Sequence, residues 1–315
     1  MQKTGSLNKY YCALALAQCG IGINVVINKL LITVMPMLML LACRFCLSTL
    51  FLGLLLRLTH TPITAPSHPA GKATASDWLY LSLQGLAAGF LFNVLFVWGL
   101  NYTSATAAGA ISCTLPAIIG LTALWLLNER LSSRKVMALG LAISGILVLN
   151  LDYFSAAMPS HQYALQGNLL VLCAMFPQAS YSILGRKLAG RITPLGGAFI
   201  ANLAGLACLV PSTLWVNGPH LPNNLPWVYY GLIVLGASCS LMFFWGWSWG
   251  LSRIGASVAA AFGGVMPLTT TCLAFFLLGE PLHMQDMLGI LLVIASVLVG
   301  ANIGFAKPKP VITAN

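Results

Sequence analysis

Ten apolar runs follow one another along this chain, and most are about as long as a membrane is thick. A helix needs roughly 20 apolar residues to cross the hydrocarbon core of a bilayer. Backbone groups in lipid must pair within a helix or a closed barrel, and these runs are continuous rather than alternating, so helices are expected. The predicted spans are 10–33, 37–57, 78–100, 104–127, 134–151, 167–185, 195–216, 227–250, 256–278 and 284–304.

Composition agrees with an all-α polytopic membrane protein of ten transmembrane helices. Hydrophobic residues make up 59% of the chain and charged residues 6%, whereas a soluble domain carries about 25% charged residues. The mean hydropathy is +0.89. This set of residues cannot cover a water-facing surface, so the lipid bilayer is expected as the surrounding partner.

One passage occurs twice in the chain. Residues 98–129 and 249–280 share a Trp-Gly-Leu start, a proline inside an apolar span (Pro116, Pro267) and a terminal glutamate (Glu129, Glu280). The starts of the two halves also correspond, because Lys29 aligns with Lys187. An internal repeat in a hydrophobic chain is typical of a secondary transporter. We expect two five-helix repeats, 1–155 and 156–315, within one membrane domain.

Loop charges predict the orientation. The chain has 15 Lys and Arg residues, and lysines and arginines favour the cytoplasmic side. If the N-terminus is cytoplasmic, the residues on that side are Lys3, Lys9, Arg57, Lys72, Arg130, Arg134, Lys135, Arg186, Lys187, Arg191, Arg253, Lys307 and Lys309. The sequence therefore predicts a multi-pass protein of a bacterial-type inner membrane with both termini cytoplasmic. Because each repeat has an odd number of spans, the second is inverted relative to the first. The loop 59–77 is expected to be a mobile cytoplasmic connection.

Several function classes lack support. The basic residues are scattered between apolar runs without a basic face or arm, which argues against nucleic-acid binding. The sequence contains neither a nucleophile–base set nor a phosphate loop, so we expect no enzyme. No His/Cys cluster with metal-ligand spacing occurs, so we expect no metal and no cofactor. The expected partner is a small-molecule substrate, and the expected state is a monomer, with a dimer as the alternative.

The order of several motifs resembles the EamA-type members of the drug/metabolite transporter superfamily. The first two spans carry Asn24, Lys29, Pro36 and Arg44. Residues 102–105 of the first copy read Tyr-Thr-Ser-Ala, and both copies of the passage carry the mid-span proline and the terminal glutamate. The resemblance covers nearly the whole chain. It implies ten helices around a central cavity lined by spans one, three, four, six, eight and nine, and transport of amino acids, other metabolites, quaternary amines or drugs. One departure is Ile21, where the family often has tryptophan.

Charged residues near the span ends are candidates for gates. Lys29 and Glu280 fall near the outer ends of spans one and nine, and Lys187 and Glu129 near the inner ends of spans six and four. We hypothesise two pseudo-symmetric ion pairs, each stabilising one closed gate; alternatively, the glutamates merely end their helices. Arg44 lies inside span two, where a charge is costly. It could contact a substrate carboxylate, or it could bind backbone carbonyls or share Glu280.

Polar and aromatic residues inside the spans are candidates for substrate contact: Asn24, Asn28, Gln84, Asn93, Ser112, Gln178, Tyr181, Trp245 and Trp249. Gln84 and Asn93 are expected on opposite sides of span three, so that only one faces the cavity. Serines in membrane helices often bond only to their own helix. Trp98 and Trp249 could instead belong to an interfacial aromatic belt.

We therefore expect an alternating-access secondary transporter that moves a small metabolite, most plausibly an amino acid and by export. The alternative is a carrier of organic cations such as quaternary amines or drugs, held by the aromatic residues of span eight through cation–π attraction. A membrane enzyme or scaffold is a remote alternative, and a channel is a weaker one.

Overall fold

The computed structural model describes residues 4–64, 73–115, 118–119, 133–149, 163–188, 191–217, 225–251 and 262–300. These residues form ten helical segments, and every predicted span overlaps one of them. The described residues of the first half form α1 (Thr4–Leu31), α2 (Met37–Leu58), α3 (Ala75–Gln84), which continues through the π-helical η1 (Gly85–Leu91) into α4 (Phe92–Tyr102), then α5 (Ala105–Ser112) and α7 (Ser133–Leu149).

The second half has the same number of helical segments among its described residues. They are α9 (Ala164–Leu188), α10 (Pro194–Asn217), α11 (Trp227–Leu251), the short 3-10 turn η3 (Phe262–Gly264) leading into α13 (Val265–Leu273) and the π-helical η4 (Ala274–Leu278), and α14 (Met284–Gly300).

Four described helical stretches are long and apolar enough to cross a membrane: Lys9–Leu31, Met37–Leu58, Ala75–Tyr102 and Leu195–Val216. Shorter apolar helices lie in α7, α11, α14 and residues 262–278. Large apolar side chains on the outside, such as Trp215 and Phe276, are exposed, as expected where lipid replaces water. The helical membrane architecture predicted from the sequence is thus confirmed.

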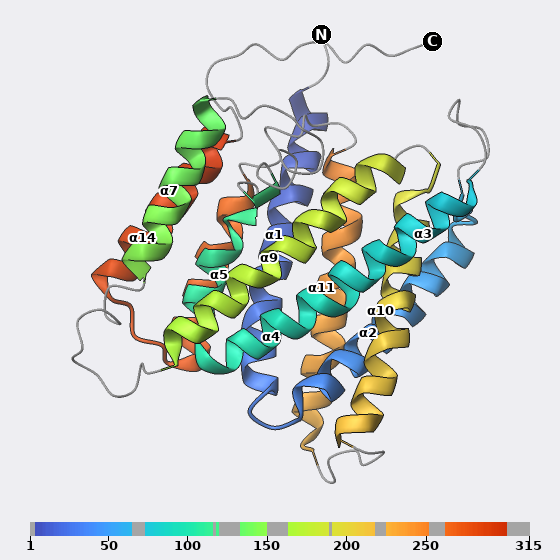
Figure 1. The fold of residues 1–315 in the computed structure, drawn as a ribbon, viewed down its shortest axis with the longest axis horizontal. Helices are drawn as coiled ribbons and strands as arrows, with labels where there is room; N and C mark the ends of the chain where they lie inside the picture. The colour runs from blue at the N-terminus through green and yellow to red at the C-terminus, as the bar shows by residue number, and fades with distance from the viewer. Residues whose placement is uncertain are drawn as a thin grey trace.

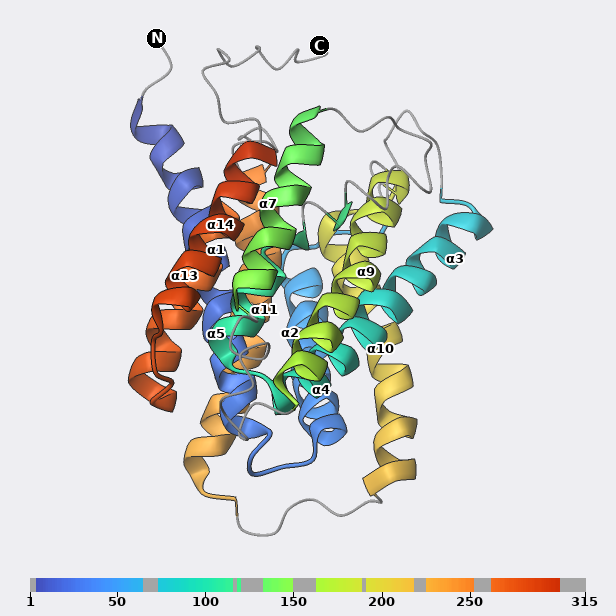
Figure 2. The same ribbon diagram turned by 60° about the vertical axis from the view of Figure 1, so that its left-hand side comes forward.

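The helices form one bundle whose segments run back and forth between two ends (Figures 1 and 2). The start of α1 and the end of α14 lie at the same end of the bundle, which we call the terminal end. The opposite end, where α1 leads into α2 and α4 into α5, is called the far end.

Helices from the two halves of the chain pack against each other. α1 packs on α11 and α13, α4 on α9, α2 on α10 and α7 on α14. Figure 2 shows α7 and α14 side by side, with their axes nearly aligned. The halves are therefore interlocked, and the interface between them runs through the middle of the bundle.

Pairs of glycines permit two close crossings between helices of the two halves. A Cβ on Gly99 of α4 would lie 2.7 Å from the carbonyl oxygen of Gly167 on α9. A Cβ on Gly89 of η1 would lie 2.8 Å from the carbonyl oxygen of Ala201 and 3.0 Å from Cα of Gly205 on α10. Small residues let membrane helices approach backbone to backbone, where dispersion contacts drive association.

A break separates α4 from α5 at the far end. Thr103, whose backbone is extended, follows the last residue of α4. Ser104 caps the start of α5, because its Oγ accepts a hydrogen bond from the amide of Ala107 at 3.0 Å. This break, Thr103–Ser104, places the C-terminus of α4 beside the N-terminus of α5.

The glycine crossings predict which alanine substitutions are tolerated. Gly99→Ala forces α4 and α9 apart, so we expect a loss of stability of about 1–3 kcal/mol. Gly140→Ala on α7 is the matched control, because nothing lies within 4 Å of its added Cβ and alanine favours a helix by up to about 1 kcal/mol. Thermal unfolding in detergent measures both. Equal unfolding midpoints would contradict the close approach.

Candidate functional site

A buried network of polar side chains connects α1, α2 and α11. Asn24 and Asn28 are each 5% exposed and lie one turn apart on α1. Nδ2 of Asn24 donates to the carbonyl of Gly236 at 3.0 Å and to Oγ of Ser240 at 2.9 Å, both on α11. Nδ2 of Asn28 donates to Oδ1 of Asn24 at 3.1 Å. Polar groups inside an apolar bundle are costly unless bonded, and these amides are bonded.

Arg44 completes the network from α2. It lies seven residues into α2, roughly 10 Å along the helix, and is 6% exposed. Nη1 donates to Oδ1 of Asn28, and Nη2 donates to Oγ of Ser240 at 3.3 Å. Nε is buried and has no hydrogen-bond partner among the described residues. The predicted alternatives of backbone carbonyls or Glu280 are replaced by these two neutral side chains.

The described acidic residues lie elsewhere. Asp77 pairs with Arg191 at 3.2 Å and Asp286 with His283 at 3.5 Å. Glu280 bonds at the start of α5. Glu129 and Asp152 lie outside the described residues. Within the described part of the chain, the buried guanidinium of Arg44 is therefore without a carboxylate partner.

Lys29 and Glu280 both bind the break between α4 and α5. Nζ of Lys29 donates to the carbonyls of Leu100 and Thr103 at 2.6 and 2.7 Å. Glu280 accepts from the amides of Ala105 and Thr106 at 2.7 and 3.1 Å, and from Oγ1 of Thr106 at 2.9 Å. A cation thus holds the C-terminus of α4 and an anion the N-terminus of α5, as the helix dipole favours.

The expected Lys29–Glu280 ion pair is consequently not formed as a direct contact in this conformation. The two charges still act on each other electrostatically across the break. Both side chains bond to backbone groups of the first half, although Glu280 itself belongs to the second half.

The ion pair predicted at the terminal end stays a prediction. Glu129 and the side chain of Lys187 lie outside the described residues. The described residues that meet there are Pro62–Thr64 and Asp77 from the first half and Arg191–Thr193 from the second, which we call the terminal-end clasp.

The clasp combines backbone and charge. Thr64 and Ile192 form an antiparallel bridge, and the amide of Thr193 donates to the carbonyl of Ile63 at 2.9 Å. The carboxylate of Asp77, which also caps α3 through the amide of Thr74 at 2.7 Å, binds Arg191. The start of the 59–77 connection is therefore bonded to the second half. Residues 65–72 lie outside the described part, and the mobility of the connection stays a prediction.

The other predicted polar residues are distributed along α3 to α9. Nε2 of Gln84 donates to the backbone carbonyl of Tyr181 at 2.9 Å, so these two lie together between α3 and α9. Gln178 is half-buried on α9, three residues before Tyr181. Nδ2 of Asn93 in α4 donates to two carbonyls of the preceding π-helical segment η1 at 2.7 and 3.2 Å. Ser112 donates to the carbonyl of Ala108 at 2.7 Å, the back-bonding alternative.

The aromatic candidates are described only in part. The side chains of Trp245 and Trp249 lie outside the described residues, although α11 extends through both positions. Trp98 is 47% exposed near the end of α4, as the alternative of an interfacial aromatic residue requires. In the described residues, no group of three His, Cys, Asp or Glu could hold a metal ion.

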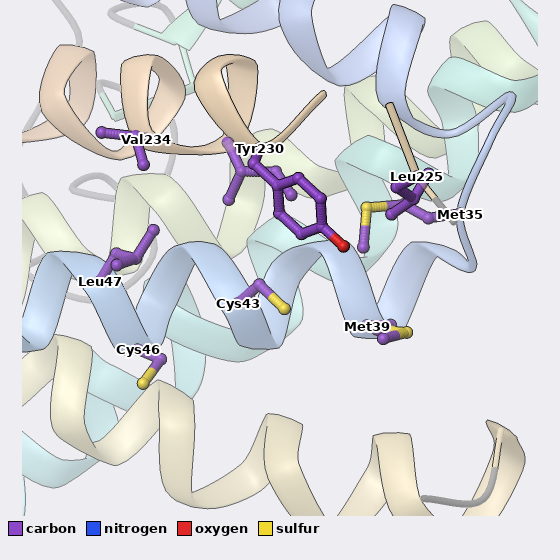
Figure 3. Close-up of a pocket in the computed structure, with 9 residues that line it drawn as sticks. Met35, Met39, Cys43, Cys46, Leu47, Leu225, Tyr230 and Val234 are labelled. Atoms are coloured by element: carbon purple, nitrogen blue, oxygen red, sulfur yellow. The ribbon is translucent and has the colours of Figure 1, made fainter. Parts of the chain in front are cut away.

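An apolar groove of about 400 Å³ lies between α2 and α11 (Figure 3). Tyr230 and Val234 line it from α11, while Met39, Cys43 and Leu47 line it from α2. Arg44 follows Cys43 in sequence but bonds to side chains of α1 and α11. The groove is a surface for apolar contacts and is lined without charge.

Sequence reasoning missed the contributions of α11 and of the clasp. Gly236 and Ser240 receive the bonds of Asn24. Their spacing of one turn in an apolar helix was a signal from which a polar contact on one face of this helix could have been predicted. Asp77 had the signal of a capping box with Thr74, but its pairing with Arg191 depends on how the halves meet.

Comparison with known proteins agrees with the geometry. The profile of the EamA-like transporter family matches residues 8–151 and 165–300. The uncharacterized transporter YetK of Bacillus subtilis is 26% identical over 295 residues, which cover 92% of this chain and 86% of YetK. An uncharacterized transporter of Methanothermobacter thermautotrophicus is 23% identical over 294 residues, which cover 90% of this chain and 83% of that protein.

A crystal structure of another protein has the same fold, with a TM-score of 0.62 and 16% identity over 95% of this chain and 98% of that one. The family profile matches most of the residues, one segment in each half, and the described helices form the apolar bundle that a membrane carrier requires. This chain belongs to the EamA-like transporter family, and is an integral membrane transporter.

Proposed function

We propose that this protein is an alternating-access secondary transporter that exports a small polar metabolite, an amino acid, across the inner membrane. The observation that carries the proposal is the buried network of Asn24, Asn28, Arg44 and Ser240. Polar and ionisable groups in a membrane interior are costly, and they commonly mark substrate pathways. This network lies between helices of the two halves, where the substrate of a repeat-built carrier binds.

The chemistry of the network favours an amino acid over an organic cation. Its amides and hydroxyl can bond ammonium and carboxylate groups alike, because each amide both donates and accepts. Its only charge is the positive guanidinium of Arg44 among the described residues. A quaternary amine would meet an unfavourable like charge there.

The packing pattern supports an inverted repeat. In the order of segments, α1 corresponds to α9, α2 to α10, α4 with η1 to α11, α5 to α13 and α7 to α14. α1 packs on α11 and α13, and α9 correspondingly on α4 and α5; α2 packs on α11, and α10 correspondingly on η1. α1 runs from the terminal end to the far end, whereas α9 runs the other way (Figure 1). Two such copies can exchange conformations to open opposite faces.

The distribution of charge supports an orientation with the terminal end in the cytoplasm. Lys9, Arg57, Arg134 and Arg191 occur where helices meet that end, while Glu280 and Asp286 occur at the far end. Basic residues are retained on the cytoplasmic side. The Thr103–Ser104 break is then the outer gate, and the clasp the inner one.

The proposed cargo is tested by binding and flux. Purified protein should be stabilised thermally by one or more proteinogenic amino acids and not by choline or tetraethylammonium, because a ligand that binds the folded state raises the melting temperature. Proteoliposomes should then show saturable movement of the amino acids that bind. A shift with the cations alone would contradict the amino-acid cargo, and non-saturable flux would indicate a channel.

The outer gate is tested with Glu280→Gln, which keeps the shape and removes the charge. We expect weaker protection of the Ala105 and Thr106 amides, since a charge at a helix N-terminus contributes about 0.3–1 kcal/mol, and an altered transport rate. Hydrogen exchange and proteoliposome flux measure these effects. Asp286→Asn, at the same end and bonded to His283, is the control. Unchanged protection and flux in both Glu280→Gln and Lys29→Met would contradict the gate.

The inner gate is tested with Arg191→Gln, which removes the charged contact of the clasp but leaves its backbone bonds. Arg191 is 35% exposed and Asp77 3% exposed in their side chains, so we expect a loss of roughly 1 kcal/mol at most. Hydrogen exchange of residues 191–197 should accelerate up to about fivefold. His283→Gln, which changes the side-chain contact with Asp286 at the far end, should leave these residues unchanged. Acceleration in both variants would argue against a local gate.

A further inference from the structure

The guanidinium of Arg44 has one edge fixed and one edge directed at the other half of the protein. Nη1 is bonded to Asn28 of α1, within the first half. The opposite edge, formed by Nε and Nη2, faces α11 of the second half. There Nη2 meets Oγ of Ser240 at 3.3 Å, and Nε lies 3.5 Å from the position that a Cβ of Gly236 would take.

This edge is poorly satisfied for a buried arginine. Of its two donors, Nε has no acceptor among the described residues, and Nη2 has only a long bond to a neutral hydroxyl. That hydroxyl already accepts from Asn24 at 2.9 Å and donates to the carbonyl of Gly236 at 3.1 Å. An arginine buried in this way is expected to bind an anion, because two parallel N–H groups match the two oxygens of a carboxylate.

We propose that the Nε/Nη2 edge of Arg44 is the carboxylate-binding site of the transporter, and that Ser240 occupies it when no substrate is bound. The proposal rests on the proposed transport function and deepens it, since it assigns the cargo to solutes that carry a carboxylate. The carboxylate takes the place of Oγ of Ser240 and bonds Nε and Nη2 side by side. Asn28 holds the remaining Nη1 and so fixes the plane of the guanidinium.

The site explains how binding is linked to the two halves. Arg44 and Asn28 belong to α2 and α1, whereas Ser240 and Gly236 belong to α11. The Nε atom is closed off in this conformation, so α11 must move away from α1 and α2 before a carboxylate can enter. The same relative movement of the halves opens a repeat-built carrier.

Gly236 provides a test that leaves the arginine in place. Its added Cβ would lie 3.5 Å from Nε and 3.9 Å from Cδ of Arg44, which is ordinary van der Waals contact. Gly236→Ala therefore fits the substrate-free structure but covers the Nε–H. A methyl group there removes one of the two donors from the edge.

The experiment measures ligand affinity for the purified full-length protein in nanodiscs by titration calorimetry. The probes are the proteinogenic amino acids, their α-carboxamides, the simple acids acetate, lactate and succinate, and choline. We expect a carboxylate to bind roughly 30-fold or more tightly than its carboxamide, since loss of one partner of a buried charge pair is costly. Arg44→Gln should abolish this preference, and Arg44→Lys and Gly236→Ala should reduce it.

Arg57→Gln is the matched control, because Arg57 lies exposed at the other end of the same helix; this variant should keep the full preference. If Arg44→Gln does not fold, as judged by its unfolding midpoint, the result for Gly236→Ala decides. Amino acids that bind as well as their carboxamides, or a preference that survives in Arg44→Gln and Gly236→Ala, would overturn the carboxylate site and leave the amino-acid cargo standing. If simple acids bind in an Arg44-dependent way and amino acids do not bind, the result would support the site and reject that cargo. Binding of choline alone would reject both.

Discussion

A polar atom in the membrane interior has no water to bond, and this constraint organises the structure. Many side chains satisfy it locally: Ser112, Asn202 and Ser212 bond to carbonyls one turn earlier in their own helices. Such bonds cost little and tie no helices together. Among the described residues, other polar groups bond to another segment at the network, at the Thr103–Ser104 break and at the clasp. Three single contacts do the same elsewhere: Gln84 on Tyr181, Thr213 on Leu38 and Ser296 on Ala138. These are the places where the two halves of the chain meet.

The two charges at the Thr103–Ser104 break bond to backbone groups rather than to each other. Lys29 binds carbonyls at the end of α4, and Glu280 binds amides at the start of α5. A direct ion pair would have to offset the desolvation of both charges with one contact. Helix termini offer several unsatisfied groups to each charge, so the break between two helices can receive a cation and an anion at once.

The sequence predicted the spans well because membrane length and hydrophobicity leave little choice of structure. It also identified Asn24, Asn28 and Arg44 as residues of interest, since polar residues are conspicuous in apolar runs. It could not predict that they meet Ser240, because this contact depends on the crossing of α1 and α2 with α11. Spacing arguments were least reliable in span three. There the π-helical segment between Gln84 and Asn93 changes the residues per turn, so their relative directions do not follow from a period of 3.6.

α1 joins the network to the Thr103–Ser104 break, because Asn28 and Lys29 are adjacent. Asn28 accepts from Arg44, and the next residue holds the end of α4. A shift of α1 that changes the bond to Arg44 must therefore also move Lys29 relative to the break, unless its long side chain compensates. Packed helices move as rigid elements between discrete arrangements rather than deforming continuously. One helix thus carries both the group that orients Arg44 and the cation that holds the end of α4. If Arg44 binds the substrate and the break is a gate, as proposed, α1 is a mechanical element common to both.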